Sequence, residues 1–287
     1  MKIKNNEMLK NYTTMKIGGV AQNFYIPQSV EELLVCLRSL GKNTYYLLGN
    51  GSNILINDTK TFEHVVWLKE FNKACEFHTD GRFYFGASLP IQQVINFANK
   101  QGFGGLEYLY SVPSLLGGAV AMNAGRGKRF NRQISDYIVS VDILDLETLE
   151  KKTIACSACQ FSYRNSIFKH HTDKYIVLGG TFVFPAMSMQ ESSRRKQERM
   201  AYAAKLQDHN SPNLGSIFRR HNHYLTALFR WGFWGRCGGC RFSHRTVNWL
   251  INTGNGTYRQ MLTLIKRVEK IHALLGCKIE REIVTWD

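Results

Sequence analysis

The sequence predicts an α+β protein rather than a doubly wound parallel sheet. Helical and strand patterns follow one another without the strict strand–helix–strand order of a parallel sheet. The 287 residues correspond to about two domains, at roughly 100–200 residues each. With 44% hydrophobic and 21% charged residues, the composition is globular and excludes the disordered, collagen-like and coiled-coil classes.

Helices are predicted where apolar residues recur three or four positions apart. The first begins at a capping box formed by Ser29 and Glu32 and ends before Gly41. Thr257 is the expected N-cap of the last helix, and Gly276 lies beyond its end. The predicted helices cover residues 29–40, 91–98, 191–206 and 257–275.

Strands are predicted where β-branched and aromatic residues are bounded by turn residues. These runs are residues 45–48, 65–68, 83–85, 138–144, 176–184 and 279–284. Composition changes at Pro185 and, more weakly, near Phe71. We therefore expect domains at residues 1–70, 71–185 and 186–287, with the strand at 279–284 able to return to the first part of the chain.

The charge is strongly basic and unevenly distributed. The chain has 37 Lys and Arg against 22 Asp and Glu, a formal charge of +15. No acidic residue occurs between His209 and Val268. Because a surface of one sign concentrates anions, this stretch suits nucleic acid or a phosphorylated small molecule. Charge alone also leaves an ordinary solvated face open.

The seven cysteines are odd in number and follow no secretory signal, which is typical of free thiols in a reducing compartment. No apolar run approaches the roughly 18 residues of a membrane span, so a cytoplasmic protein is expected. The two C-x-x-C pairs, 156/159 and 237/240, are about 77 residues apart, whereas a zinc ribbon spaces them by about 15–20. We predict no metal site, and dithiol chemistry stays a weak alternative.

Two glycine-rich segments could hold a flat or phosphorylated ligand. The first reads LGNGSN at 48–53 and the second VPSLLGGAVAMNAG at 112–125. Glycine permits positive φ and close backbone approach, and successive amides can form a concave nest for an anion. The residues alone leave a hairpin turn open for the first segment and a tight backbone crossing for the second. Neither a P-loop nor a Rossmann fingerprint is present.

These segments belong to an ordered series of six motifs. The series is TTMKIGG at 13–19, the loop at 49–53, GGA at 117–119 with MNAG at 122–125, FSYRNSIF at 161–168, PNLGSIF at 212–218 and NTGNGT at 252–257. Over nearly its whole length the chain resembles the UDP-N-acetylenolpyruvoylglucosamine reductase (UDP-N-acetylmuramate dehydrogenase) family. Its length is similar to that of the shorter of the family's two types.

The resemblance implies a two-part FAD-binding fold of the vanillyl-alcohol-oxidase type, followed by a C-terminal α+β substrate domain. It implies FAD as the cofactor and NADPH as the co-substrate that reduces it, before an enolpyruvyl UDP-sugar is reduced to UDP-N-acetylmuramate. The implied partners are this UDP-sugar and NADPH, without nucleic acid or membrane, and a monomer is expected. The implied FAD contacts are Gly49, Asn50, Gly51, Ser52, Asn53, Pro113, Gly117, Gly118, Asn123, Ala124 and Gly125.

The resemblance also implies catalytic roles for Ser216, Arg164 and Glu282. Ser216 would be the general acid that protonates a vinyl carbon of the substrate. Arg164 and Glu282 would stabilise the negative charge that collects on the substrate carboxylate. These three side chains must then meet over one flavin ring. The resemblance also implies three substrate contacts, Tyr163, Arg219 and Arg220. Arginine forks suit the phosphate oxygens of the substrate.

The chain departs from the family pattern at several positions. Residues 114–115 (SL) replace a glycine and a hydroxyl residue, residues 219–221 (RRH) replace Lys-Asn-Pro, and Arg281 replaces the proline before Glu282. These departures keep two alternatives open. One is a flavin oxidoreductase of the same fold that acts on another anionic substrate, and the other is a non-catalytic flavoprotein or binding module.

Overall fold

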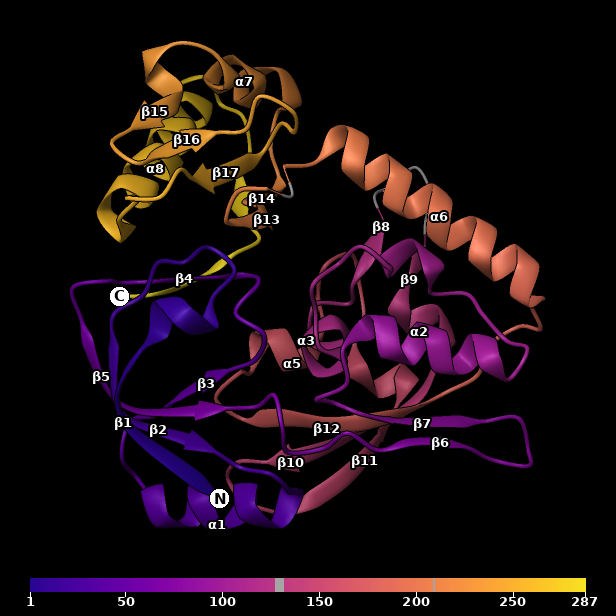
Figure 1. The fold of residues 1–287 in the computed structure, drawn as a ribbon. Helices are drawn as coiled ribbons and strands as arrows, with labels where there is room; N and C mark the ends of the chain where they lie inside the picture. Colours follow the sequence, from indigo (N-terminus) through magenta and orange to yellow (C-terminus); the bar gives the residue numbers. More distant parts are fainter. Residues whose placement is uncertain (127–131, 209) are drawn as a thin grey trace. The chain divides into compact units, whose positions relative to one another are not determined.

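The computed structural model describes residues 1–126, 132–208 and 210–287, which form two compact units. The first unit comprises Met1–Lys2, Tyr25–Asn43 and Val66–Ala201. The second comprises Ile3–Phe24, Thr44–Val65 and Tyr202–Asp287. Each unit is therefore assembled from chain segments that are far apart in sequence, as the colours of Figure 1 show.

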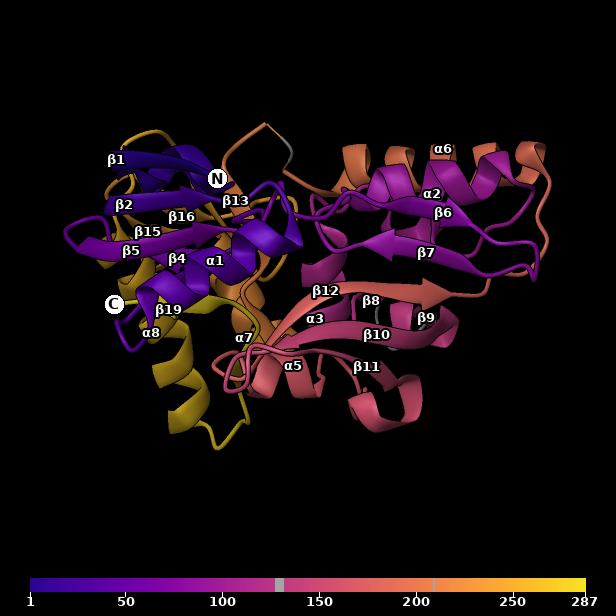
Figure 2. The ribbon, with the colours of Figure 1, turned by 90° about the horizontal axis from the view of Figure 1, so that it is seen from below.

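The first unit contains a five-stranded antiparallel sheet. Phe83 and Phe85 lie two positions apart on one strand and are fully buried, as is Phe182 on the neighbouring strand. Because alternate residues of a strand share a face, these rings form the core of one side of the sheet. The strands lie in the order β11 (Lys151–Ala155), β10 (Ile138–Asp145), β12 (Tyr175–Phe182), β7 (Phe83–Gly86) and β6 (Cys75–Phe77), which Figure 2 shows.

Helices α2 and α3 lie over one face of this sheet (Figure 1). Helix α1 begins where the sequence predicts, since the Ser29 hydroxyl accepts the Glu32 N–H at 3.1 Å. The Glu32 carboxylate, however, accepts the N–H of Gln28 at 2.8 Å instead of that of Ser29, so only half of the predicted capping box forms. Among the described residues, the helices that begin in this unit are α1 (Val30–Leu40), α2 (Ile91–Lys100), α3 (Leu116–Ala121), α5 (Ile167–His170) and α6 (Met189–Leu206).

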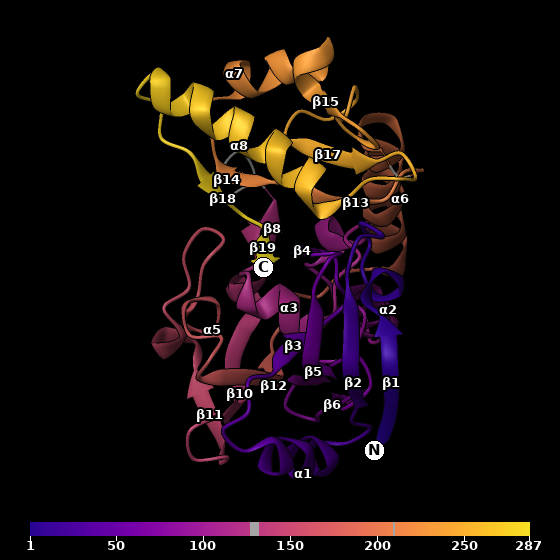
Figure 3. The same cartoon turned by 90° about the vertical axis from the view of Figure 1, so that its left-hand side faces the viewer.

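The second unit holds a four-stranded sheet of N-terminal strands, seen side by side in Figure 3. Their order is β1 (Lys2–Met8), β2 (Val20–Ile26), β5 (Thr61–Trp67) and β3 (Tyr46–Leu48). Terminal residues of β1, β2 and β5 belong to the first unit. The first two strands were not predicted, because β1 is almost wholly exposed and carries no buried apolar alternation.

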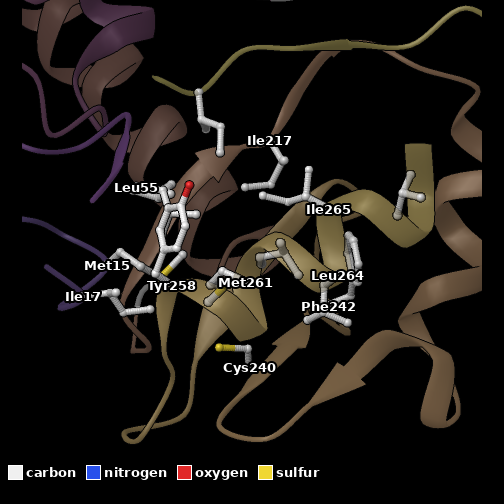
Figure 4. Close-up of a cluster of buried hydrophobic side chains, with 14 of the residues drawn as sticks. Met15, Ile17, Leu55, Ile217, Cys240, Phe242, Tyr258, Met261, Leu264 and Ile265 are labelled. Carbon is white, nitrogen blue, oxygen red and sulfur yellow. The ribbon is translucent and has the colours of Figure 1, made fainter. Parts of the chain in front are cut away.

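The C-terminal part of this unit is a sheet packed on a long helix. The sheet order is β13 (Asn213–Ser216), β17 (Trp249–Asn252), β16 (Cys240–Phe242) and β15 (Arg236–Cys237), accompanied by α7 (His223–Ala227) and α8 (Tyr258–Leu274). Met261, Leu264 and Ile265 of α8 are fully buried. Figure 4 shows them in one cluster with Met15 and Leu55 from the N-terminal segments. The second unit therefore has a core shared by the two ends of the chain.

Short pairs of strands complete the fold. β14 (Phe218–Arg220) pairs with β18 (Glu280–Arg281), β4 (Ile54–Ile56) pairs in parallel with β19 (Val284–Trp286), and β8 (Gly125–Arg126) pairs with β9 (Arg132–Gln133). Single 3₁₀ turns occur at Leu9–Tyr12, Glu107–Leu109, Ile134–Tyr137, Cys156–Cys159, Leu228–Arg230 and Phe233–Gly235. Within the described ranges, no helix has the length and apolarity that crossing a membrane requires.

Candidate functional site

The glycine loop at residues 49–53 connects β3 to β4. These strands belong to different sheets, so the loop is not a hairpin turn. Gly51 has φ of +65°, and a Cβ placed on it would lie 2.1 Å from the carbonyl oxygen of Tyr12. The Thr14 N–H donates to the Gly51 carbonyl at 3.0 Å. Only glycine fits at position 51, and the segment around Thr14 fixes the loop.

Asn53, at the end of this loop, is bonded to the segment that carries Glu282. Its side-chain amide donates to the Glu282 carbonyl at 3.2 Å, and its own carbonyl accepts the Val284 N–H at 3.0 Å. The Glu282 N–H donates in turn to the carbonyl of Ile217 at 2.7 Å. Ile217 directly follows Ser216. The second unit therefore joins the glycine loop, Glu282 and Ser216 in one hydrogen-bonded array.

Ser216 is the last residue of β13 and is partly exposed. The chain after it is held by Asn248, whose side chain is 5% exposed. The Asn248 side chain accepts the Phe218 N–H at 2.9 Å and donates to the Phe218 carbonyl at 2.7 Å, while its main-chain carbonyl accepts the Ile217 N–H at 3.0 Å. Asn248 was missed from the sequence. The only signal for it is an asparagine, which tolerates its φ of +72°, directly before an apolar run.

Arg164 lies at the tip of a tight turn in the first unit. Ser162 and Asn165 exchange two backbone hydrogen bonds of 3.1 and 3.0 Å, which leaves Tyr163 and Arg164 as the central residues. Tyr163 is 44% exposed. Arg164 has φ of +56°, a conformation that costs an L-residue roughly 1–2 kcal/mol. Such strain is typical of positions that a binding or catalytic site requires.

The second glycine-rich segment is tied to this turn. Asn123 is 1% exposed, and its amide donates to the Ser162 carbonyl at 2.9 Å and to Gln133 at 2.8 Å. The Ser166 hydroxyl donates to the carbonyl of Ala121 at 2.6 Å. The Asn123 side chain therefore binds protein groups and ties the segment to the turn that carries Arg164.

The main-chain contacts of this segment agree with a tight backbone crossing and also with a surface for a ligand, the two possibilities that the sequence left open. The Gly117 N–H donates to the Ala87 carbonyl at 2.9 Å, and a Cβ on Gly117 would lie 3.0 Å from the Ala87 Cβ, which is a tight backbone crossing. Pro113 and Gly118 are exposed, Gly125 beyond the helix is partly exposed, and Ala124 is buried. The crossing thus leaves one side of the segment accessible.

The two predicted substrate arginines share one carboxylate. Guanidinium nitrogens of Arg219 and Arg220 lie 2.9 and 3.7 Å from the oxygens of Glu280. All three side chains are partly exposed to solvent. An anionic substrate would therefore compete with Glu280 for these guanidinium groups, which sequence reasoning did not foresee.

The two C-x-x-C pairs lie in different units. Cys237 and Cys240 face each other across the β15–β16 hairpin, whereas Cys156 and Cys159 form a 3₁₀ turn. Burial raises the pKa of Cys240 to about 12 and that of Cys159 to about 12. Outside residues 127–131 and 209, no group of three or more His, Cys, Asp or Glu side chains is arranged to hold a metal ion.

We expect Cys240 to resist alkylation by iodoacetamide in the folded protein. With a pKa of about 12, only about one thiol in 10⁴ is ionised at pH 8, and the thiolate is the reactive form. Labelling should accelerate as the pH rises towards 12, and mass spectrometry of labelled peptides measures it. Rapid labelling of native Cys240 at pH 8 would contradict the raised pKa.

Two protein families match separate parts of the chain. Residues 21–148 match the FAD binding domain family, and residues 207–286 match the C-terminal domain of UDP-N-acetylenolpyruvoylglucosamine reductase. The chain is a flavoprotein-type oxidoreductase, with an FAD-binding domain of the vanillyl-alcohol-oxidase type and a C-terminal domain of the reductase type.

Whole-chain comparisons are consistent with these matches. A UDP-N-acetylenolpyruvoylglucosamine reductase of Clostridium novyi (strain NT) is 33% identical over 93% of this chain and 86% of its own length. The reductase of Thermosipho melanesiensis is 32% identical over 98% and 94% of the two chains. The protein belongs to the UDP-N-acetylenolpyruvoylglucosamine reductase family. The crystal structure of the Thermus caldophilus reductase, 24% identical, has the same fold with a TM-score of 0.79 over 100% of both chains, which confirms the predicted fold class.

The residues of the glycine loop fit FAD. A Cβ placed on Gly49 would meet no atom within 4 Å, so this side of the loop is open to a ligand. Residues 49, 50, 52 and 53 of the loop are partly exposed and provide amide and hydroxyl donors of the kind that a pyrophosphate requires, whereas Gly51 is buried against the backbone of residues 12 and 13. The loop would therefore hold the pyrophosphate of the cofactor.

Proposed function

We propose that the protein reduces UDP-N-acetylglucosamine enolpyruvate to UDP-N-acetylmuramate with NADPH, a step of peptidoglycan synthesis. One observation carries this proposal: the hydrogen bonds that join the glycine loop to Glu282, and Glu282 to the residue after Ser216. They support a hydroxyl and a carboxyl held beside the loop that would bind FAD. The family to which the chain belongs supports the choice of substrate.

The roles of the protein's own groups follow from the chemistry of the substrate. FAD, when bound, supplies hydride transfer from NADPH to the carbon–carbon double bond of the enolpyruvyl group. Negative charge then collects on the substrate carboxylate, and the Arg164 guanidinium and the Glu282 carboxyl oppose it as preorganised partners. The Ser216 hydroxyl gives its proton to the remaining vinyl carbon. A positioned acid of this kind contributes about 10²–10⁴-fold to the rate.

The basic stretch between His209 and Val268, which contains no acidic residue, also has a role in this proposal. UDP-sugar and NADPH both carry phosphates, and guanidinium forks bind phosphate oxygens in two-point contacts. Arg219 and Arg220 would bind the substrate diphosphate once it displaces Glu280. Electrostatic capture of anions accounts for the basic charge without nucleic acid.

Single-turnover spectroscopy of the purified protein tests the proposal. The protein should be yellow, and NADPH should bleach it under anaerobic conditions. Adding UDP-N-acetylglucosamine enolpyruvate should restore the oxidised flavin spectrum and yield one UDP-N-acetylmuramate per flavin. A protein that does not take up FAD would contradict the cofactor, and a reduced flavin that the substrate leaves bleached would contradict the reaction.

Arg164 allows activity to be separated from stability. Both Arg164→Ala and Arg164→Gly remove the guanidinium, so each should slow flavin reoxidation by the substrate. Of these two residues, glycine adopts φ of +56° without strain and alanine does not, so the glycine variant should have a free energy of unfolding about 1 kcal/mol higher than the alanine variant. Urea denaturation measures this difference. Equal stability of the two variants would show that the turn relaxes when the arginine is removed.

A further inference from the structure

Arg281, the residue before Glu282, forms a two-point ion pair with Glu269. Its Nε and one terminal nitrogen lie 2.5 and 2.7 Å from the two carboxylate oxygens. The side chains are 31% and 27% exposed. The hydrogen bonds that Arg281 donates to the Glu269 carboxylate raise the pKa of Arg281, so the guanidinium stays charged. A planar fork of this kind fixes orientation, which a lysine ammonium does not.

Glu269 belongs to a helix that is held in place by its buried face. It follows Val268 on α8, and the buried face of that helix, which includes Leu264, Ile265 and Val268, is inaccessible to solvent. Figure 4 shows Ile217 beside Ile265 in the same cluster. A side chain attached to α8 by two hydrogen bonds is therefore fixed relative to the chain that follows Ser216.

Glu282 itself lies in a gap between two short strands. Arg281 ends β18, where it pairs with Phe218, and β19 begins only at Val284. Glu282 is fixed through its main chain, with its N–H bonded to Ile217 and its carbonyl bonded to Asn53. Apart from these two hydrogen bonds, no regular strand continues through this position to hold it.

We propose that Arg281 is a positioning residue: its fork with Glu269 holds the Glu282 main chain against Ile217 and so aims the Glu282 carboxyl relative to Ser216. This inference rests on the roles proposed for Glu282 and Ser216. The side chains of the fork are partly exposed, so its contribution to overall stability is limited by solvent screening. Its effect is on geometry, to which a reacting centre is far more sensitive than the fold is.

Half-reactions of the holoenzyme test the proposal. In Arg281→Met, flavin reduction by NADPH should keep its wild-type rate. Reoxidation by UDP-N-acetylglucosamine enolpyruvate should slow by about 10- to 100-fold, the range expected when a catalytic group is displaced by up to about 1 Å. Glu269→Gln should show a similar loss. Arg281→Lys, which keeps the charge without the fork, should fall between wild type and Arg281→Met.

Arg194→Met is the matched control. Arg194 makes a similar two-point contact, at 2.8 and 2.8 Å, with Glu191 on α6 and also bonds to Glu198. Removing this fork should change neither half-reaction. A loss in Arg194→Met as large as that in Arg281→Met would overturn the proposal, because the effect would then be common to any surface fork.

The Glu282→Gln background separates positioning from general damage. If Arg281 acts through the carboxyl of Glu282, then adding Arg281→Met to Glu282→Gln should cause no further slowing of reoxidation. If the double variant slowed reoxidation by the product of the two separate effects, the proposal would be contradicted. Equal slowing of both half-reactions by Arg281→Met would also contradict it. Normal reoxidation in Glu282→Gln would instead refute the proposed role of Glu282. Slow reoxidation in Glu282→Gln with normal reoxidation in Arg281→Met would refute only the positioning role.

Discussion

Ser216→Ala is expected to leave reduction of bound FAD by NADPH unchanged and to slow reoxidation by the enolpyruvyl sugar nucleotide by about 100-fold or more. The hydroxyl proton is needed only after hydride has reached the substrate, so only the second half-reaction depends on it. The variant should fold normally, because Asn248 and the β13–β17 pairing hold the backbone without the hydroxyl. Stopped-flow absorbance of the flavin measures both half-reactions.

Ser211→Ala provides the control for this prediction. Ser211 lies five residues before Ser216 in the same unit, ahead of β13. Its removal should leave both half-reactions at the wild-type rate. If Ser216→Ala slowed reduction and reoxidation equally, Ser216 would be a structural residue and another group would have to deliver the proton.

The helices were predictable because their limits are set by neighbouring residues. Thr257 accepts the Gln260 N–H at 3.3 Å, and α8 covers Tyr258–Leu274 against a prediction of 257–275. Gly41, with φ of +55°, ends α1 as expected. Caps of this kind act within one turn of the chain, so a single sequence contains the information.

The last predicted strand, residues 279–284, shows where local pattern is insufficient. It divides into β18 and β19, because Glu282 between them bonds to Ile217 and Asn53. Those partners are 65 and 229 residues away in sequence (282 − 217 and 282 − 53). Whether the strand continues at this point depends on residues that are distant in sequence, so a short stretch of sequence does not predict it.

The same limit applies to the candidate site. The motif series contains Ser216 and Arg164, and the family resemblance adds Glu282, but the groups that hold these residues were not predictable. Asn248 is bonded across 30 residues, and the Asn123 amide joins segments 39 residues apart. Supporting contacts of this kind depend on the folded arrangement, whereas the candidate residues themselves were identified from the resemblance.

Gly51→Ala is expected to abolish stable FAD binding. A Cβ at this position would lie 2.1 Å from the Tyr12 carbonyl oxygen and 2.8 Å from the Thr13 Cα, and both are backbone atoms that cannot rotate away. The left-handed conformation adds roughly 1–2 kcal/mol. The loop must therefore move off residues 12–14, and we expect FAD affinity to fall by about 100-fold or more, since each 1.4 kcal/mol is about tenfold. Fluorescence titration of the apoprotein with FAD measures the affinity, and thermal unfolding of the apoprotein should show a lower Tm.

Gly49→Ala distinguishes damage to the loop from obstruction of the ligand. Position 49 does not have positive φ, and an added Cβ would meet no protein atom within 4 Å. The apoprotein should therefore keep its Tm, while the methyl group projects from the side of the loop where the pyrophosphate is proposed to bind. Weaker FAD binding at unchanged stability would place the cofactor against this side of the loop. Unchanged FAD affinity in Gly49→Ala would show that the cofactor does not approach residue 49. The role of the loop would then be limited to its hydrogen bonds with the segment that carries Glu282.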